Sequence, residues 1–575
     1  MNDAGDGRRR PRINAMYEGE CSLSQTMFRM IAAGAVCAAL LPLSACGGAS
    51  DAGDTNAQGS SDAVITAYDT EPQGPLIPSN TNERGGSKPN SLIFARLVTF
   101  TSEGKPVNEA AESIHANPDS TQYTIKLRPD WKFTDGSAMT ASSFTRAWSY
   151  AANVTNAQKT ASYFSTIKGY DALQTPGVSG DAQLEGLKVI DDRTFTVDLV
   201  RPDSVFPIKV GYNAFSPLPE SFYKDPKAFG EHPVGNGQYK FKSWEHNKSI
   251  QLVRNPDYKG RFKPRNGGVT FMIYTANEAA YADVQAGHLD VMENVPSSAS
   301  KTFTSDETVQ AYNKPGSVIE TVDIPSDLEH FKIDQEGILR RQAVSMSIDR
   351  DTICRKVLSG TSTAAKGFAA PTIPGYTTDL KNAGNLKYNP RKAKDLWEQA
   401  NRISPWPSDG HLDFTYNADQ NYAPVYRAVA NMVKSNLGIQ SDDVPIPTFQ
   451  EFRQNVSERK VGGGFHAGWS PDYPSVENYL KPLYGSAAAH GKGANDNDYS
   501  SAEFDGLMEQ ADKASSPDKV GKYYDQAQGV LLHDLPGMPL YYVNANGVAS
   551  KRVKDFVISW QNFPVYWQMS VGSDQ

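Results

Sequence analysis

Residues 123–150 read YTIKLRPDWKFTDGSAMTASSFTRAWSY and contain the signals of a strand, a turn and a helix in direct succession. Residues 123–127 alternate apolar and polar side chains, as a half-buried strand does. The Asp-Gly pair within 133–137 favours a tight turn. Thr140 is a suitable N-cap for a helix that continues to Tyr150. This stretch predicts a strand that passes directly into a helix, which is the basic unit of an α/β fold.

The same alternation continues along the chain. Further strand patterns occur at 63–68, 195–199, 239–241, 250–253, 269–274 and 414–416. Helical spacing occurs at 278–286, 338–348, 391–400, 424–437 and 449–458. Because strands and helices alternate throughout, we expect an α/β protein with mixed sheets.

Composition limits the functional classes. The chain has 575 residues, 39% hydrophobic content and a net charge of −8, which is typical of a globular protein of two to four domains. It has no long basic run beyond its first segment, which argues against a nucleic-acid partner. Its four cysteines form no CxxC pair, so zinc-ribbon and redox motifs are absent.

The N-terminus carries the features of an exported lipoprotein. Five arginines precede an apolar run at 30–43, which suits a secretory signal but is too short to span a membrane. The sequence LSACG at 43–47 resembles a bacterial lipobox, so we expect a signal peptide over 1–45 and a lipid on Cys46. Residues 47–61 are small and polar, as in a flexible linker. The alternative is an ordinary cleaved signal followed by a chance cysteine, and Met16 or Met27 would also start a working signal.

Seven motifs then occur in order across residues 127–390. They are LRPDWKFTDG at 127–136, TASSF at 140–144, GNGQY at 235–239, RNPDY at 254–258, GHLD at 287–290, RRQA…IDR at 340–350 and YNP at 388–390. Together they resemble the family 5 extracellular solute-binding proteins, the peptide/nickel/dipeptide type that includes oligopeptide-binding proteins. The sequence departs from the family pattern at Gln238, where the usual residue is proline.

This resemblance implies a periplasmic-binding-protein-like II fold, an α/β architecture with two lobes around a hinged cleft and a small inserted third domain. Lobe I would comprise residues 62–100, 200–308 and 540–575. The inserted domain would occupy 101–199, and lobe II would occupy 309–539. A ligand would be enclosed when the lobes close about the hinge.

The motif GWSPDYP at 468–474 supplies the main site candidates. By resemblance, Asp472 would pair with the free α-amine of a bound peptide, because a dehydrated ammonium needs a well-placed carboxylate. Trp469 is either a wall of the ligand pocket or a core residue, and Tyr473 belongs to the same motif. The alternative interpretation of Asp472 is a loop residue in a proline-flanked turn.

The carboxylate end of a peptide needs a cation. Arg459 and Lys460 precede the motif, but they can equally be surface charges. His466 stands where some relatives carry an arginine, so the sequence leaves open which residue contacts the peptide's C-terminal carboxylate. Asn80, after the first strand, lies where relatives line the cleft.

The sequence therefore predicts a monomeric extracytoplasmic peptide receptor, anchored to the cell membrane through Cys46, that serves the permease of an ABC importer. Oligosaccharides, nickel chelates and signalling peptides are the alternative ligands. A secreted hydrolase is the alternative of another class, but the chain lacks GxSxG, HExxH and GxxxxGK[ST] motifs. We therefore expect no enzymatic activity, no cofactor and no metal.

Overall fold

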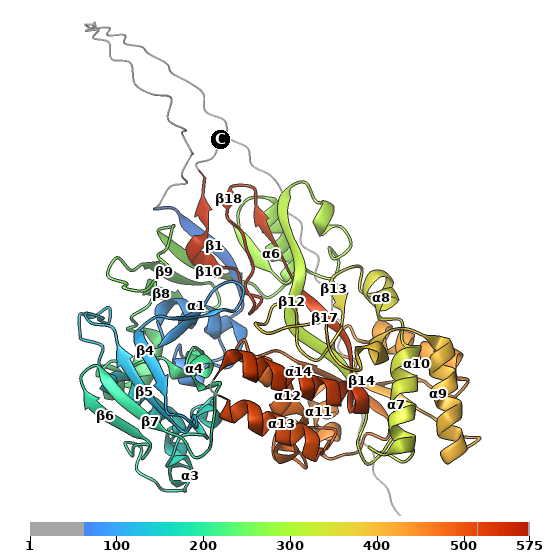
Figure 1. The fold of residues 1–575 in the computed structure, drawn as a ribbon. Helices are drawn as coiled ribbons and strands as arrows, with labels where there is room; N and C mark the ends of the chain where they lie inside the picture. The colour runs from blue at the N-terminus through green and yellow to red at the C-terminus, as the bar shows by residue number, and fades with distance from the viewer. Residues whose placement is uncertain (1–61, 515, 573–575) are drawn as a thin grey trace, which may run out of the picture. The chain divides into compact units, whose positions relative to one another are not determined.

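The computed structural model describes residues 62–514 and 516–572, and Figure 1 shows their path. The predicted signal peptide, Cys46 and the linker therefore lie outside the described residues. Within the described ranges, we find no helix with the length and apolar character needed to cross a membrane.

The largest element is a mixed sheet of 11 strands. β1 is parallel to β10 and β11, whereas β12 is antiparallel to β16 and β17. In spatial order the strands are β15 (Asp443–Ile446), β14 (Phe414–Asn417), β16 (Gly464–Trp469), β12 (Val309–Asp323), β17 (Gly537–Ser550), β11 (Val291–Glu293), β1 (Val64–Asp69), β10 (Gly268–Ile273), β9 (Ser249–Arg254) and β8 (Tyr239–Glu245), with β13 (Ser362–Ala364) beside β17.

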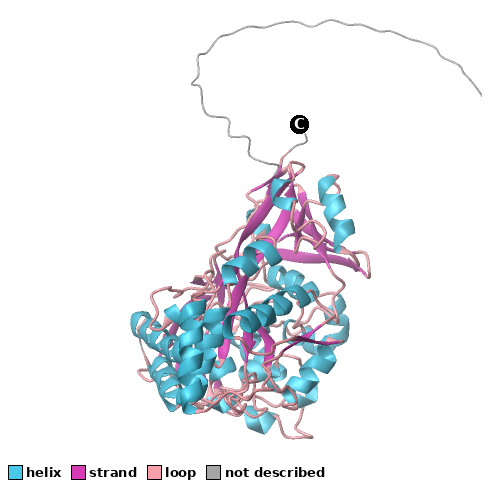
Figure 2. Cartoon of the chain, turned by 90° about the vertical axis from the view of Figure 1, so that its right-hand side faces the viewer, coloured by secondary structure: helices cyan, strands magenta, loops and turns pink. Residues whose placement is uncertain are grey.

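β12 and β17 are the long strands that join the two halves of this sheet. Their pairing runs from Val309 opposite Ser550 to Asp323 opposite Gly537. Ala549 packs into the hydrophobic core around β1 and β10, whereas Tyr542 packs into a second core formed with the helices of residues 335–534. Figure 2 shows strands, in magenta, running from the upper part of the view into a region surrounded by helices. One strand pair therefore connects two separate cores.

The β12–β17 pair contains an irregularity in register between Pro315 and Ile319. Gly316 lies within it, and an added Cβ would be 2.5 Å from the carbonyl oxygen of Val543. We expect Gly316→Ala to lower the free energy of unfolding by about 1–3 kcal/mol, because the two backbones would have to separate. Urea denaturation measures this difference.

Gly506→Ala is the matched control for this prediction. Gly506 lies in α13 (Ala502–Lys513), and no heavy atom of the described residues lies within 4 Å of its added Cβ. Alanine should stabilise that helix by about 0.5–1 kcal/mol. Equal changes in stability for the two variants would contradict the role assigned to Gly316.

A separate antiparallel sheet has the order β4-β5-β7-β6. Phe144 and Trp148 of α2 pack against Phe195 of β7, with ring centroids 6.0 and 5.7 Å apart. The strands of this four-stranded sheet are β4 (Ala111–Ala116), β5 (Gln122–Leu127), β7 (Thr194–Asp198) and β6 (Leu187–Asp191). The described residues also form two two-stranded sheets, β2 (Val98–Phe100) with β3 (Pro106–Asn108) and β18 (Val553–Lys554) with β19 (Ser570–Val571).

The helices begin and end where the local sequence signals predict. Thr140 forms a capping box with Ser143, the side chain of Asn389 accepts a hydrogen bond from Lys392 N, and Gly438 ends α10 at φ 72°. The six predicted helices and seven predicted strands are confirmed. The helices are α1 (Arg84–Ile93), α2 (Ala141–Ala152), α3 (Tyr170–Leu173), α4 (Phe206–Lys209), α5 (Pro226–Glu231), α6 (Asn277–Gln285), α7 (Gln335–Ser347), α8 (Arg350–Thr352), α9 (Pro390–Ile403), α10 (Ala423–Leu437), α11 (Phe449–Ser457), α12 (Glu477–Tyr484), α13 (Ala502–Lys513) and α14 (Pro517–Asp534).

A buried ion cluster connects α1 to the large sheet. Lys88 Nζ lies 3.0 Å from Asp69 Oδ1 and 2.7 Å from Glu293 Oε1, and all three side chains are at most 2% exposed. Burial raises the pKa of Asp69 to about 7. The lysine therefore compensates two carboxylates that have lost their contact with water.

Candidate functional site

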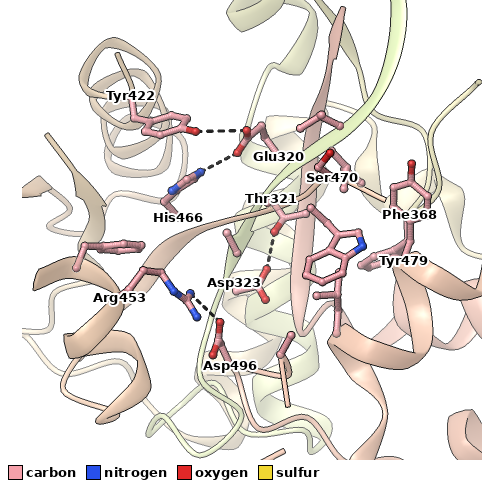
Figure 3. Close-up of a pocket in the computed structure, with 18 of the residues that line it drawn as sticks. Glu320, Thr321, Asp323, Phe368, Tyr422, Arg453, His466, Ser470, Tyr479 and Asp496 are labelled. Atoms are coloured by element: carbon pink, nitrogen blue, oxygen red, sulfur yellow. Dashed lines mark hydrogen bonds and ion pairs between the residues drawn. The ribbon is translucent and has the colours of Figure 1, made fainter. Parts of the chain in front are cut away.

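A cavity of 450 Å³ lies against β12 and β16 and beneath α11 and α12. Figure 3 shows polar and aromatic side chains from these elements around it. Its lining consists of Val318, Ile319, Glu320, Thr321, Asp323, Phe368, Gln420, Tyr422, Phe449, Phe452, Arg453, His466, Ala467, Gly468, Trp469, Ser470, Tyr479, Leu483, Tyr484, Ala494 and Asp496. A cavity of this size, mostly apolar with a few polar groups, is typical of a small-ligand site.

The backbone of β12 explains why neighbouring residues share this cavity. Alternate side chains of a strand normally point to opposite faces. The pairing with β17 shifts between Glu320 and Thr321, and such an irregularity redirects side chains. Glu320, Thr321 and Asp323 all line the cavity as a result.

Glu320 and His466 form one polar pair in the cavity wall. His466 Nε2 lies 2.7 Å from Glu320 Oε2, and the Tyr422 hydroxyl donates to Glu320 Oε1 at 3.4 Å. Because the carboxylate accepts, Nε2 is the ring nitrogen that carries the hydrogen. The imidazole also packs on the Tyr422 ring, with centroids 4.0 Å apart. The position of the His466 ring is thus fixed by its hydrogen bond to Glu320 and its packing on Tyr422.

Arg453 and Asp323 complete the polar part of the wall. Arg453 Nη1 lies 2.8 Å from Asp496 Oδ2. Asp323 accepts hydrogen bonds from Thr321 Oγ1 at 2.7 Å and Asn497 Nδ2 at 2.6 Å. Burial, reinforced by the negative charge of Asp496, raises the pKa of Asp323 to about 6.

Asp472 is connected to this wall through a buried amide. The Asn478 side chain accepts hydrogen bonds from Trp469 Nε1 and from the backbone N–H of Asp472, both at 2.9 Å, and donates to Asp472 Oδ2 at 3.2 Å. The Tyr163 hydroxyl donates to Asp472 Oδ1 at 2.5 Å. Burial raises the pKa of Asp472 above its usual value. The Asp472 carboxylate therefore lies at a contact between Tyr163 and the segment 469–478, which are far apart in the sequence.

Trp469 and Tyr473 have different surroundings although they share one motif. Trp469 lines the cavity and also packs against the adjacent hydrophobic core. Tyr473 is buried, and its hydroxyl donates to Glu477 Oε2 at 2.6 Å. Lys209 Nζ lies 5.6 Å from the centre of the Tyr473 ring. Tyr473 thus supports the loop that carries Asp472.

Among the described residues, the other predicted site residues lie outside this cavity. Arg459 forms a two-point ion pair with Asp498, with both N–O distances 2.7 Å. Lys460 is exposed and pairs with Glu458. Asn80 ends a short 3₁₀ turn, Pro78–Asn80, that receives hydrogen bonds from Thr160. Of the predicted site residues, Trp469 and His466 line the cavity. Asp472 is outside the lining and is linked to Trp469 through Asn478, whereas Arg459, Lys460 and Asn80 have no such link in the described part of the chain.

Sequence reasoning missed several residues of this site. The sequence does contain a signal for Glu320 and Asp323, since both are charged residues in the segment 318–324, whose other residues are apolar except for Thr321. Arg453 and Asp496 left none, because they are separated by 43 positions and their pairing depends on the tertiary fold.

Residues 105–491 match the family described as bacterial extracellular solute-binding proteins, family 5, middle region. The chain belongs to this family. Its members are transport receptors that act outside the cytoplasm and are not enzymes.

Individual relatives cover nearly the whole chain. The oligopeptide-binding protein OppA of Bacillus subtilis is 25% identical over 90% of this chain and 95% of its own length. The heme-binding protein A of Haemophilus influenzae is 26% identical over 93% of this chain and 98% of its own length. The periplasmic oligopeptide-binding protein OppA of the same organism is 28% identical over 84% of this chain and 88% of its own length.

Two solved structures show the fold. The periplasmic murein tripeptide-binding protein MppA, in its unliganded open form, superposes with a TM-score of 0.78 at 21% identity and covers 90% of this chain and 99% of its own. Haemophilus influenzae OppA in complex with RPPGFSPFR superposes with a TM-score of 0.65 at 22% identity and covers 90% of this chain and 100% of its own. The predicted fold class is confirmed: periplasmic-binding-protein-like II, with two lobes around a hinged cleft and an inserted domain.

Proposed function

We propose that this family member is a peptide receptor of an ABC importer. It binds a peptide between its lobes, with the peptide's α-amine at Asp472, and delivers it unchanged to a membrane permease. The protein acts as a monomer, has no enzymatic activity and is held at the outer face of the cell membrane by a lipid on Cys46.

The observation that carries this proposal is the position of the Asp472 carboxylate. It is partly buried, it accepts neutral hydrogen bonds from Tyr163 and Asn478, and its supporting amide also holds the Trp469 wall of the cavity. A carboxylate in such a setting gains most from a cationic donor, because a charge-assisted hydrogen bond is stronger than a neutral one. A peptide's α-ammonium is such a donor, and recognising it requires no particular side chain.

The remaining parts of the proposal rest on the family and on the relatives. The relatives named as oligopeptide-binding proteins support a peptide ligand. We assign 62–100, 200–308 and 540–575 to lobe I, 101–199 to the inserted domain and 309–539 to lobe II, and each strand of the four-stranded sheet lies within 111–198. The lipobox at 43–47 supports the lipid anchor.

Native mass spectrometry of the mature protein, purified from its own cells without ligand exchange, tests the proposal. We expect a released mass that fragments as a peptide with a free N-terminus. In a second sample, protein incubated with a peptide of known sequence should return that peptide unchanged. Release of a sugar or a nickel chelate would contradict the ligand class. Conversion of an added peptide into products would contradict the receptor function.

A further inference from the structure

The cavity of lobe II carries an excess of negative charge. Three carboxylates, those of Glu320, Asp323 and Asp496, line it together with a single guanidinium, Arg453. The formal charges of these four side chains sum to −2. The guanidinium is already engaged by Asp496 at 2.8 Å, so it offers little attraction to a further anion.

Burial makes this charge effective. Glu320 is 7% exposed and Asp323 is 6% exposed, and Coulomb interactions strengthen as water is removed from around the charges. The hydrogen-bond partners of both acids are a tyrosine, a threonine, an asparagine and an imidazole. The buried guanidinium of Arg341, which is outside the cavity lining, offsets part of the charge of Asp323. His466 Nδ1 is also buried and has no hydrogen-bond partner among the described residues.

Aromatic rings supply the rest of the wall. Tyr422, Phe449, Phe452, Trp469 and Tyr479 line the same space. Aromatic faces attract a cation through their quadrupole and also pack against the methylene groups of a long side chain. Carboxylates and rings in one cavity therefore match a group that is cationic at its tip and apolar along its stem.

We infer that this cavity selects a basic side chain, lysine or arginine, of the bound peptide and disfavours an acidic one. The inference rests on the proposed peptide-receptor function and specifies its substrate class. Glu320 and Asp323 determine the charge preference, the aromatic rings hold the aliphatic stem, and Arg453 limits the preference by neutralising Asp496.

Calorimetry with a scanned peptide set tests the inference. The probes are alanine pentapeptides with free termini, in which lysine, norleucine or glutamate replaces each position in turn. At one position we expect the lysine peptide to bind at least tenfold more tightly than the norleucine peptide. The glutamate peptide should bind more weakly than the norleucine peptide. At that position Glu320→Gln should lower the lysine-to-norleucine affinity ratio at least fivefold, whereas Arg453→Gln should raise it.

The two variants make the test independent of a general loss of structure, because they shift the ratio in opposite directions. Glu245→Gln is the matched control, since Glu245 is 61% exposed in a surface pair with Lys248, and it should leave the ratio unchanged. Peptides that bind without any charge preference would overturn this inference alone. Failure of every peptide, including pentaalanine, to bind would overturn the proposed function instead.

Discussion

Replacement of Asp472 with asparagine is expected to weaken the binding of free-amine peptides at least tenfold, a loss of about 1.4 kcal/mol. The amide has the shape of the carboxylate, and its oxygen still accepts the hydrogen bond that Tyr163 donates to Asp472 Oδ1, although the bond from Asn478 to Oδ2 is lost. It lacks the negative charge that compensates a desolvated ammonium, so the charge-assisted part of the interaction is lost. Isothermal titration with one pentapeptide measures the change.

N-acetylation of the same peptide removes its α-ammonium group, the proposed partner of Asp472. The acetylated peptide should bind wild-type protein poorly, and Asp472→Asn should change its affinity little. Asp395→Asn is the matched control, because Asp395 is an exposed residue of α9. Equal affinity of wild-type protein for free and acetylated peptides would reject the anchoring role of Asp472.

Replacement of Lys88 with methionine should destabilise the fold by about 3–5 kcal/mol, because the buried Asp69 loses its ion-pair partner and the buried Glu293 keeps only the partly exposed Arg84, whose Nη2 lies 3.9 Å from Glu293 Oε1. Lys88 Nζ lies 3.0 Å from Asp69 and 2.7 Å from Glu293, and all three side chains are at most 2% exposed. Methionine retains the volume of the lysine stem, so the lost interaction is mainly electrostatic. Urea denaturation at pH 8 measures the difference in unfolding free energy.

The effect of Lys88→Met should depend on pH. The pKa of Asp69 is raised to about 7 in the folded protein, so Asp69 is ionised at pH 8 and protonated at pH 5. A protonated Asp69 needs the lysine less, and the destabilisation should therefore be smaller at pH 5 than at pH 8.

Lys126→Met is the control for burial. Lys126 also lies 3.0 Å from an acid, Glu112, but the two side chains are 46% and 42% exposed. Its replacement should cost at most about 1 kcal/mol, because surface ion pairs contribute little. Adding Asp69→Asn and Glu293→Gln to Lys88→Met should restore part of the lost stability. Equal losses for the two single lysine variants would contradict the electrostatic explanation.

The amino-acid sequence by itself determined the local elements and the family. The strand, turn and helix of residues 123–150 form β5 and α2, and the expected helices at 391–400 and 424–437 form within α9, which begins after Asn389, and α10, which ends at Gly438. These features depend on neighbouring residues, through alternation, turn geometry and capping. Even so, the apolar segment 92–100 is divided between the end of α1, an extended piece and β2, because packing overrides a simple apolar run.

Only the tertiary structure decided which polar residues share the cavity. The motif at 468–474 pointed to Asp472 and Trp469, but their shared partner, Asn478, and the contact with Tyr163 depend on packing between distant segments. The pairing of Glu320 with His466 depends on the register of β12 against β16 and on the irregularity against β17. Such pairings join residues up to 309 positions apart, and no local periodicity encodes them, because they form only when the long strands bring separate parts of the chain together.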